Sequence, residues 1–196
     1  MTLKMQQENI TDIPKIYPEI QRKSEEIGFS MPSDLLIGSL LKTLISSKPG
    51  AQVLELGTGI GLSLSWMIEG MDTDAHLTTV DNDSELIAIA KQYFGHDKRL
   101  TIVCDDGAAW LKANRDVKFD LVFADAWPGK YSEIETVLEM INPGGFYVID
   151  DMTAQANWPE GHDKNVDRLV RYLEDRTDFS LTKMNWSTGI IIAVKK

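Results

Sequence analysis

A short run of glycines directly after an apolar segment constrains the fold of this chain more than any other feature. The apolar segment covers residues 53–56 and predicts a buried strand that leads into Gly57, Gly59 and Gly61. Glycine takes positive φ without strain and lets the backbone approach a ligand that a Cβ atom would push away. A strand that passes through such a turn into a helix builds a pocket for a nucleotide-type cofactor, because the loop amides and the helix N-terminus face the same space.

The glycine spacing argues against two other motifs. A dinucleotide fingerprint G-x-G-x-x-G would need its third glycine at the position of Leu62. A P-loop would need a terminal Gly-Lys-Ser/Thr, which this segment lacks. A bare turn without a ligand is the structural alternative at this point.

Length and composition predict one domain of enzyme size. The chain has 196 residues, 43% of them hydrophobic, and no segment is long and apolar enough to span a bilayer. Residues 1–30 are polar and predict no secretory signal, and the single Cys104 fits a reducing cytoplasm. A net charge of −10 without a basic cluster argues against nucleic-acid binding. We therefore expect a cytoplasmic protein that acts on a small molecule, with neither a membrane nor a nucleic acid as partner.

From residue 51 onward, apolar β-rich segments alternate with helical patterns, as in α/β domains with a largely parallel sheet. Strands are predicted at 52–56, 77–81, 100–104, 119–124, 145–150, 179–184 and 189–194, the last two joined as a hairpin. Helices are predicted near 13–27, 33–46, 60–70, 84–94, 107–114, 131–141 and 164–175, with Ser33 or Pro32 opening the second. One domain over 1–196 is expected, with a helical cap at 1–48 and a cofactor-binding core at 49–196.

Acidic residues stand at the end of each of the first five predicted strands. They are Glu55, Asp81, Asp105, Asp106, Asp125, Asp150 and Asp151. Ligands of parallel α/β sheets bind beyond the carboxyl ends of the strands, so these side chains are expected to converge on one rim. Chance is the alternative, because aspartate is common in turns.

Several motifs together carry a resemblance to a known family. The E-x-G-x-G-x-G segment resembles motif I of the class I S-adenosylmethionine (AdoMet) methyltransferases. Met31 and Gly38, the segments 119–126 and 142–145, and the pair Asp150-Asp151 resemble the small cation-dependent O-methyltransferases, of which catechol and caffeoyl-CoA enzymes are the best known. The resemblance implies a doubly wound Rossmann-like fold with seven strands, mostly parallel with an antiparallel last strand, preceded by helices. It also implies methyl transfer from AdoMet to an oxygen of a small acceptor, assisted by Mg²⁺.

The cofactor residues are assigned from this resemblance and from the strand ends. Asp81 is expected to accept hydrogen bonds from the two ribose hydroxyls, since a carboxylate can serve both at once. Asp106 is expected to accept from the adenine amine, and its alternative is a helix N-cap. The expected cofactor-binding residues are Met31, Glu55, Gly57, Thr58, Gly59, Gly61, Ser63, Asp81, Asn82, Asp106, Gly107, Ala108 and Asp125.

The metal and catalytic residues follow from the resemblance alone. It implies that Asp125, Asp150 and Asp151 hold Mg²⁺, which prefers oxygen ligands. Two positions depart from the family, because Asp151 stands where the family has asparagine and Pro128 stands where it has a lysine. Lys130, two positions further on, is a candidate replacement as base or charge stabiliser, and its alternative is a solvated lysine that opens a helix at residue 131. The expected catalytic set is therefore Asp125, Lys130 and Asp151.

The segment 152–163 is a candidate lid, because it is long and aromatic for a simple connection. Trp127 and Trp158 are expected either to form walls for a flat acceptor or to pack at the rim, and His162 is either a base or an exposed loop residue. The N-terminal helices either cap the site or form a homodimer contact. Two other functions stay open: a non-catalytic AdoMet-binding protein and an enzyme of the aminopropyltransferase type.

Overall fold

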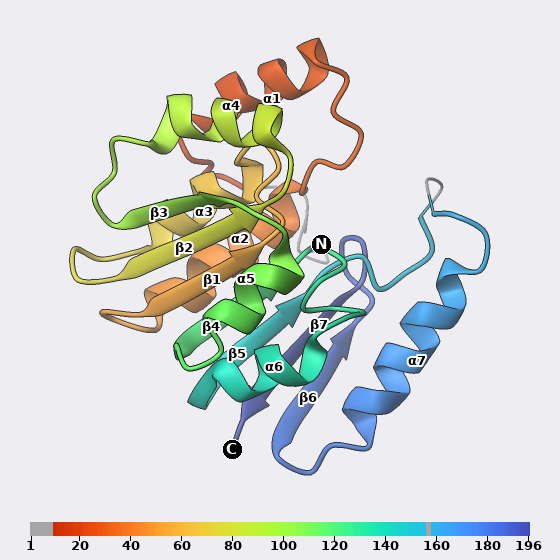
Figure 1. The fold of residues 1–196 in the computed structure, drawn as a ribbon. Coiled ribbons are helices and arrows are strands. Elements are labelled where there is room, and N and C mark those ends of the chain that lie inside the picture. Colours follow the sequence, from red (N-terminus) through yellow and green to blue (C-terminus); the bar gives the residue numbers. More distant parts are fainter. Residues whose placement is uncertain (1–9, 156–157) are drawn as a thin grey trace, which may run out of the picture.

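The described part of the protein forms one seven-stranded sheet with helices on both faces (Figure 1). A computed structural model describes residues 10–155 and 158–196. The strands are β1 Gln52–Leu56, β2 His76–Asp81, β3 Leu100–Cys104, β4 Phe119–Ala124, β5 Ile141–Ile149, β6 Phe179–Met184 and β7 Ile190–Lys195. Their spatial order is β3-β2-β1-β4-β5-β7-β6. Only β7 runs against its neighbours, β5 and β6, so the expected antiparallel last strand is confirmed among the described residues.

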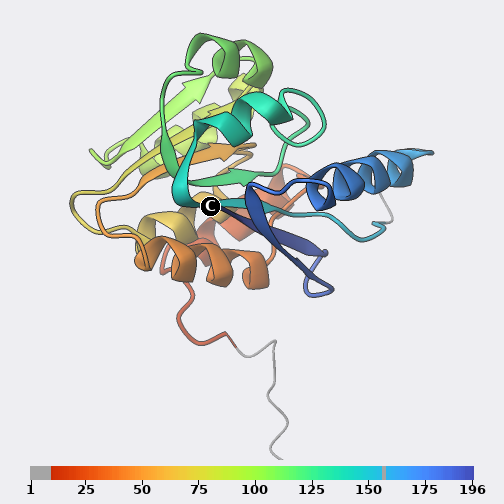
Figure 2. The ribbon, with the colours of Figure 1, turned by 90° about the horizontal axis from the view of Figure 1, so that it is seen from below.

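Two apolar clusters hold the helices to the sheet. The helices are α1 Tyr17–Glu26, α2 Leu35–Ser46, α3 Leu62–Gly70, α4 Ser84–Phe94, α5 Gly107–Ala113, α6 Ile134–Met140 and α7 His162–Glu174. Side chains of α1 to α4 join the cluster on one face, and those of α5 to α7 join the cluster on the other. The ribbon shows α2 and α3 on one side of the sheet and α5 and α6 on the other (Figures 1 and 2). Successive residues of a strand point to opposite faces, so Val53 enters the first cluster and Leu54 the second. Because both faces of the central strands are covered, these strands read in the sequence as continuous apolar segments.

Close packing of α2 on α3 uses a glycine from the predicted N-terminal cap. A Cβ atom at Gly38 would collide with the ring of Trp66, which is completely buried in the first cluster. The helix that carries Gly38 begins at Leu35. Its cap is Asp34, whose Oδ1 accepts from the amides of Leu36 and Ile37 at 2.8 and 2.9 Å, so the prediction of Ser33 or Pro32 as the opening residue is wrong.

Several other element boundaries differ from the prediction, among them the start of α1, at Tyr17 rather than residue 13. The helix expected at 131–141 begins only at Ile134, because residues 127–132 form a tight turn of their own. The strand expected from residue 145 begins at Ile141, directly after α6, and a register irregularity against β4 accommodates the extra residues. None of the helices within residues 10–155 and 158–196 has the length and apolar character needed to cross a membrane.

Candidate functional site

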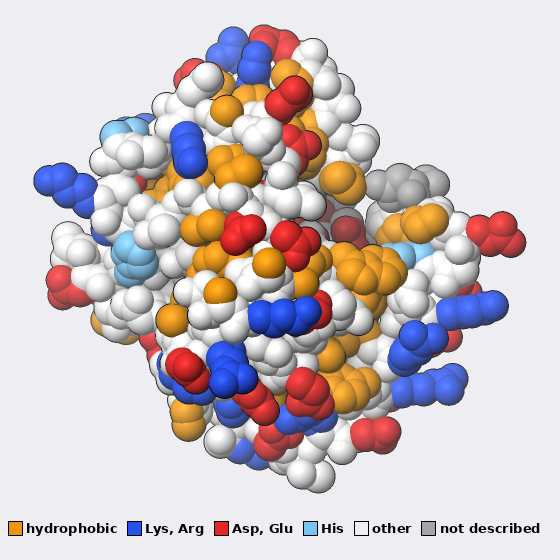
Figure 3. All heavy atoms as spheres, in the orientation of Figure 1, with side chains coloured by type: hydrophobic (Ala, Val, Ile, Leu, Met, Phe, Trp, Pro, Cys, Tyr) orange, Lys and Arg blue, Asp and Glu red, His pale blue; other side chains and the backbone are white. Residues whose placement is uncertain are grey.

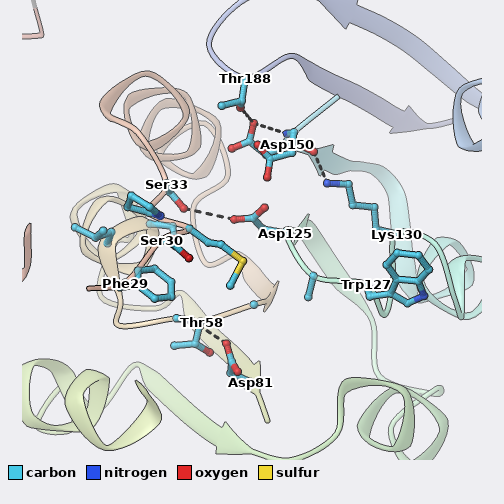
Figure 4. A pocket seen from close by; sticks show the side chains of 18 of the residues that line it. Phe29, Ser30, Ser33, Thr58, Asp81, Asp125, Trp127, Lys130, Asp150 and Thr188 are labelled. Carbon is cyan, nitrogen blue, oxygen red and sulfur yellow. Dashed lines mark hydrogen bonds between the residues drawn. The ribbon is translucent and has the colours of Figure 1, made fainter. Parts of the chain in front are cut away.

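A cavity of about 600 Å³ opens at the carboxyl ends of β1, β2, β4 and β5. Its volume lies in the range that holds a small-molecule ligand or cofactor. Its lining includes Phe29, Met31, Ser33, Gly57, Thr58, Gly59, Ser63, Asp81, Asn82, Asp125, Trp127, Lys130, Tyr131, Asp150, Asp151, Trp158, His162 and Thr188. The strand-end carboxylates of Asp81, Asp125, Asp150 and Asp151 therefore meet in one cavity, as the topology predicted (Figure 4).

The glycine loop forms one wall of this cavity. Gly57, Gly59 and Gly61 all have positive φ, at 101°, 51° and 97°. A Cβ atom at Gly57 would lie 2.8 Å from the carbonyl oxygen of Asp125, so the loop passes too close to the end of β4 for any side chain there. The carboxylate of Asp81 secures the loop, because its Oδ2 accepts from the amide of Gly59 at 2.9 Å. Its Oδ1 accepts from the amide of Asp83, and lone pairs of both oxygens remain for a ligand.

Glu55 lies beneath the glycine loop rather than in the cavity. Its side chain is completely buried, and its Oε1 and Oε2 accept from the hydroxyls of Ser63 and Thr79 at 2.5 and 2.6 Å. Thr58 is tied to the same group through a 2.6 Å hydrogen bond between its hydroxyl and that of Thr79. The expected direct contact of Glu55 with the cofactor is thus corrected. Its carboxyl braces the loop by joining β1, β2 and α3.

Glu55 gives the protein a pH-dependent stability. Burial raises its pKa from 4.5 to about 8, against the lowering effect of the Ser63 and Thr79 hydroxyls. The folded state thus holds this proton more tightly than the unfolded state, so its contribution is complete below about pH 4.5 and is lost as the pH rises towards 8. At about 1.4 kcal/mol per pKa unit, the loss has an upper bound of roughly 5 kcal/mol.

Glu55→Gln is expected to flatten this dependence, since glutamine does not ionise. Urea unfolding of both proteins at several pH values measures the effect. The difference in unfolding free energy between variant and unmodified protein should shift in favour of the variant as the pH rises. A difference that is the same at every pH would contradict the role assigned to Glu55.

A smaller hollow of about 210 Å³ adjoins the first and shares Gly57, Asp81 and Asn82 with it. Asp106 and Gly107 line the smaller hollow opposite Trp127 and Pro128, whereas Ala108 is not among the lining residues. Asp106 is also the N-cap of α5, where its Oδ1 accepts from the amide of Ala109 at 2.8 Å. The N-cap interpretation of Asp106 is therefore confirmed, while its contact with the adenine amine stays a prediction.

The carboxylates on the far wall of the main cavity repel one another. Burial and then the negative charge of Asp150 raise the pKa of Asp125 well above its ordinary value. Burial raises the pKa of Asp150 to about 6, and the nearby charge of Asp151 adds to this effect. Asp150 Oδ1 accepts from the hydroxyl of Thr188 and from the amide of Asp151, and Asp125 Oδ2 accepts from Ser33 Oγ at 3.5 Å. This wall thus concentrates more negative charge than its hydrogen bonds compensate.

Lys130 is the basic residue of this wall, and it is buried. Its side chain points into the cavity, and its Nζ donates to the backbone carbonyl of Asp150 at 2.5 Å (Figure 4). With 5% of its surface exposed, the interpretation as a solvated lysine is wrong. Its positive charge lowers the pKa of both Asp125 and Asp150.

Aromatic side chains close one side of the cavity. The rings of Trp127 and Trp158 lie 6.0 and 4.6 Å from that of His162, and Tyr131 meets His162 edge-on at 5.1 Å. The Tyr131 hydroxyl and His162 Nε2 are 3.2 Å apart, and His162 Nδ1 has no partner among the described residues. Trp127 is 52% exposed and leaves much of its ring open. The predicted lid contributes to this side, although its residues 156–157 lie outside the described part of the chain.

Some lining residues escaped the sequence analysis because distant segments bring them in. Phe29 and Asp34 come from the connection between α1 and α2, and Thr188 comes from the turn between β6 and β7. Ser187 Oγ donates to Asp34 Oδ2 at 2.5 Å and ties these two segments together. No local pattern marks these positions. The nearest signal in the sequence was the turn at residues 185–189, which contains asparagine and serine. In the structure this turn lies beside the acidic end of β5, where Thr188 donates to Asp150.

The three expected metal ligands line one cavity without forming a ligand group. Within the described residues, no three side chains of aspartate, glutamate, histidine or cysteine are arranged so that they could hold a metal ion. Asp150 directs one oxygen to Thr188 instead, and Asp151 has a positive φ of 56°. The carboxylates thus do not fit a preformed Mg²⁺ site.

The surface around the site carries both signs of charge. Figure 3 shows lysine and arginine side chains interspersed with acidic ones over this face, without a broad basic area. Phosphate backbones are recognised by clustered basic residues. The face that is shown has no such cluster.

Comparisons with known proteins agree with this geometry. A profile of the O-methyltransferase family matches residues 19–188. A Mycobacterium leprae protein that carries an O-methyltransferase assignment is 36% identical over 117 residues, which is 58% of this chain and 52% of that protein. The chain thus matches about half the length of this relative. A Mycobacteroides abscessus protein with the same assignment is 28% identical over 81% of this chain and 79% of its own.

Solved structures share the fold at low sequence identity. An O-methyltransferase of Bacillus cereus in complex with SAH superposes with a TM-score of 0.82 at 18% identity, covering 96% of this chain and 93% of the other. The O-methyltransferase TomG of Streptomyces achromogenes in complex with SAM gives 0.79 at 20% identity, covering 98% and 100%. The expected Rossmann-like fold class is confirmed. Because the family profile spans most of the chain, this protein belongs to the O-methyltransferase family.

Proposed function

We propose that this protein transfers a methyl group from AdoMet to an oxygen of a small-molecule acceptor. The observation that carries the proposal is the position of the glycine loop and Asp81 on one wall of a cavity whose other wall holds Asp125 and Lys130. One wall offers backbone amides and a ribose acceptor, and the other offers a proton acceptor and a fixed cation. Membership of the O-methyltransferase family supports the same assignment.

The cofactor fits the residues of the first wall and of the smaller hollow. The glycine loop leaves the space that a Cβ atom would fill, and Asp81 offers lone pairs to two ribose hydroxyls. Asp106 and Gly107 line the hollow that suits an adenine ring. The residues that would hold the cofactor are Met31, Gly57, Thr58, Gly59, Gly61, Ser63, Asp81, Asn82, Asp106, Gly107 and Asp125. When bound, AdoMet supplies a methyl group on a positively charged sulfur.

The second wall supplies what an oxygen acceptor needs. A hydroxyl becomes a good nucleophile when its proton is removed and its position is fixed. Asp125 is the proton acceptor in this proposal, because its buried carboxylate gains stability when a proton neutralises it. Lys130 stabilises the negative charge that develops on the acceptor oxygen, and Asp151 orients the hydroxyl.

The aromatic side of the cavity favours a flat acceptor. Trp127, Tyr131 and Trp158 present ring faces and edges beside the acidic wall. Burial, together with the charges of Asp151 and Asp125, raises the pKa of Tyr131 to about 12, so its hydroxyl remains a hydrogen-bond donor at neutral pH. An acceptor that stacks on these rings would direct a ring hydroxyl towards Asp125.

Two further expectations stay predictions. The resemblance implies Mg²⁺ on Asp125, Asp150 and Asp151, but the arrangement of these side chains does not favour it, and we route no step through a metal. A homodimer built on the N-terminal helices is testable by light scattering.

The test is transfer of a labelled methyl group from AdoMet to a panel of phenols, catechols and hydroxy acids. We expect a methyl ether from at least one phenolic acceptor, because the aromatic side and the acidic wall suit a ring hydroxyl. Product analysis by mass spectrometry locates the methyl group on oxygen. Tight cofactor binding without transfer to any acceptor would favour a non-catalytic AdoMet-binding protein, and transfer of an aminopropyl group would favour the aminopropyltransferase alternative.

A further inference from the structure

The turn at residues 127–132 is built to direct Lys130 inward. The amide of Lys130 donates to the carbonyl oxygen of Trp127 at 3.3 Å, and Gly129 takes a φ of +85° where a Cβ atom would collide with a β1 side chain. The hydroxyl of Tyr147, which is buried in the sheet, donates to the carbonyl of Gly129 at 2.5 Å. The Pro128-Gly129 sequence thus directs the side chain of Lys130 inward.

A buried ammonium needs compensation. Taking a charged group out of water costs several kcal/mol unless opposite charges and hydrogen bonds replace the water. Among the described residues, the Lys130 ammonium has one hydrogen bond, to the carbonyl of Asp150, and it lies near the negative charges of Asp125 and Asp150. Its ring neighbour is Tyr131, with Nζ 5.4 Å from the ring centroid. The acidic wall therefore pairs with Lys130 and leaves less negative charge for any second cation.

The carboxylates form hydrogen bonds within the protein and do not converge on one point. A divalent ion such as Mg²⁺ requires several oxygens that converge on one point. Asp150 Oδ1 instead accepts from Thr188 and from the amide of Asp151, and no ligand group forms among the described side chains. The chain also carries Pro128 and Asp151 at the two positions where it departs from the cation-dependent enzymes. Both departures lie beside Lys130 or its hydrogen-bond partner.

We propose that the ammonium of Lys130 takes the place of a divalent cation in this site, so that methyl transfer proceeds without a metal. The part of this inference that concerns the reaction rests on the proposed function. The part that concerns the cation preference of the cavity does not. An ammonium has three donors, and the Asp150 carbonyl uses one of them. The remaining donors serve the acceptor oxygen as its negative charge develops, which is the task a metal performs in a cation-dependent enzyme.

The experiment measures Mn²⁺ binding by electron paramagnetic resonance, without AdoMet or acceptor. The unmodified protein is compared with Lys130→Met, which keeps most of the side-chain volume without the charge, and with Lys130→Arg, which keeps the charge. Lys112→Ala removes one positive charge at an exposed position and is the matched control. The same proteins are assayed for methyl transfer with and without chelator, and thermal unfolding verifies that each variant is folded.

The unmodified protein, Lys130→Arg and Lys112→Ala are expected to bind Mn²⁺ no more tightly than about 1 mM. Lys130→Met should bind at least about tenfold more tightly, since a unit charge at close range contributes more than about 1.4 kcal/mol. Transfer by the unmodified protein should survive chelation, and Lys130→Arg should retain more activity than Lys130→Met.

Three results would overturn the proposal: micromolar Mn²⁺ binding by the unmodified protein, loss of transfer on chelation, or no gain of binding in a folded Lys130→Met. If Lys130→Met does not fold, Mn²⁺ binding and the effect of chelation on transfer, both measured with the unmodified protein, still test the proposal. Absence of transfer under every condition would count against the proposed function, while the binding data would separately decide the role of Lys130.

Discussion

Replacement of Asp125 by alanine is expected to lower the rate of methyl transfer by about two to four orders of magnitude, the usual contribution of a positioned general base. Asp125 ends β4, lines the cavity, and is pressed towards its protonated form by burial and by Asp150. Its removal takes away the proton acceptor. The missing charge relieves repulsion with Asp150 and removes attraction to Lys130, so its two effects on stability oppose each other.

The measurement combines steady-state rates with cofactor binding. Asp125→Asn is the matched variant, because it keeps the shape and one acceptor oxygen but does not take up the proton. Both variants should lose activity while retaining AdoMet affinity within about tenfold, a difference of about 1.4 kcal/mol. Asp125→Asn with unchanged activity would contradict the base assignment. Equal losses of rate and cofactor affinity would instead make cofactor binding, rather than proton transfer, the main role of Asp125.

Asp81→Ala is expected to weaken AdoMet binding by roughly ten- to a hundredfold, because hydrogen bonds to charged groups contribute about 1.5–3 kcal/mol. In the proposed site the carboxylate accepts from two ribose hydroxyls, and it also holds the loop through the amide of Gly59. Both contributions disappear together in the alanine variant. Calorimetric titration with AdoMet and with its demethylated product gives the two affinities.

Asp105→Ala controls for the loss of an acidic residue at a strand end. Asp105 follows β3, its carboxylate accepts from the backbone amide of Asp106, and it is not among the lining residues of either hollow. Its replacement should leave the affinity unchanged. Asp81→Asn should fall between alanine and the unmodified protein, since the amide keeps one acceptor. An Asp81→Ala affinity equal to that of Asp105→Ala would remove Asp81 from the cofactor site.

The sheet was predictable because its strands alternate between two apolar clusters. Boundaries of β1, β3, β4 and β6 agree with the predicted ranges, and Asp105 and Asp125 directly follow β3 and β4. Helix starts depend on single side-chain contacts and were less readable. At α2, three adjacent residues could serve as cap, and hydrogen bonds to the amides of Leu36 and Ile37 select Asp34.

In the candidate site, too, the features that follow from sheet topology were predictable, and those that depend on local packing were not. Parallel topology alone predicts that Asp81, Asp125 and Asp150 meet at one rim, and they do. The direction of Lys130 depends on a turn whose geometry is set by packing of Gly129 against β1, which no local pattern reveals. For Glu55 the sequence motif suggested a cofactor contact that the structure does not support. The motif places Glu55 next to the loop, but the alternation of side chains along β1 turns its carboxyl beneath the loop.

The most direct test is a crystal structure of the protein with S-adenosylhomocysteine. We expect ribose hydroxyls within hydrogen-bond distance of the Asp81 carboxylate, the adenine in the hollow beside Asp106 and Gly107, and the sulfur facing the side of the cavity that holds Asp125 and Lys130. The space beside the aromatic rings should stay open for an acceptor. A ligand bound elsewhere on the protein, or a sulfur turned away from Asp125, would contradict the assignment of this cavity as the methyl-transfer site.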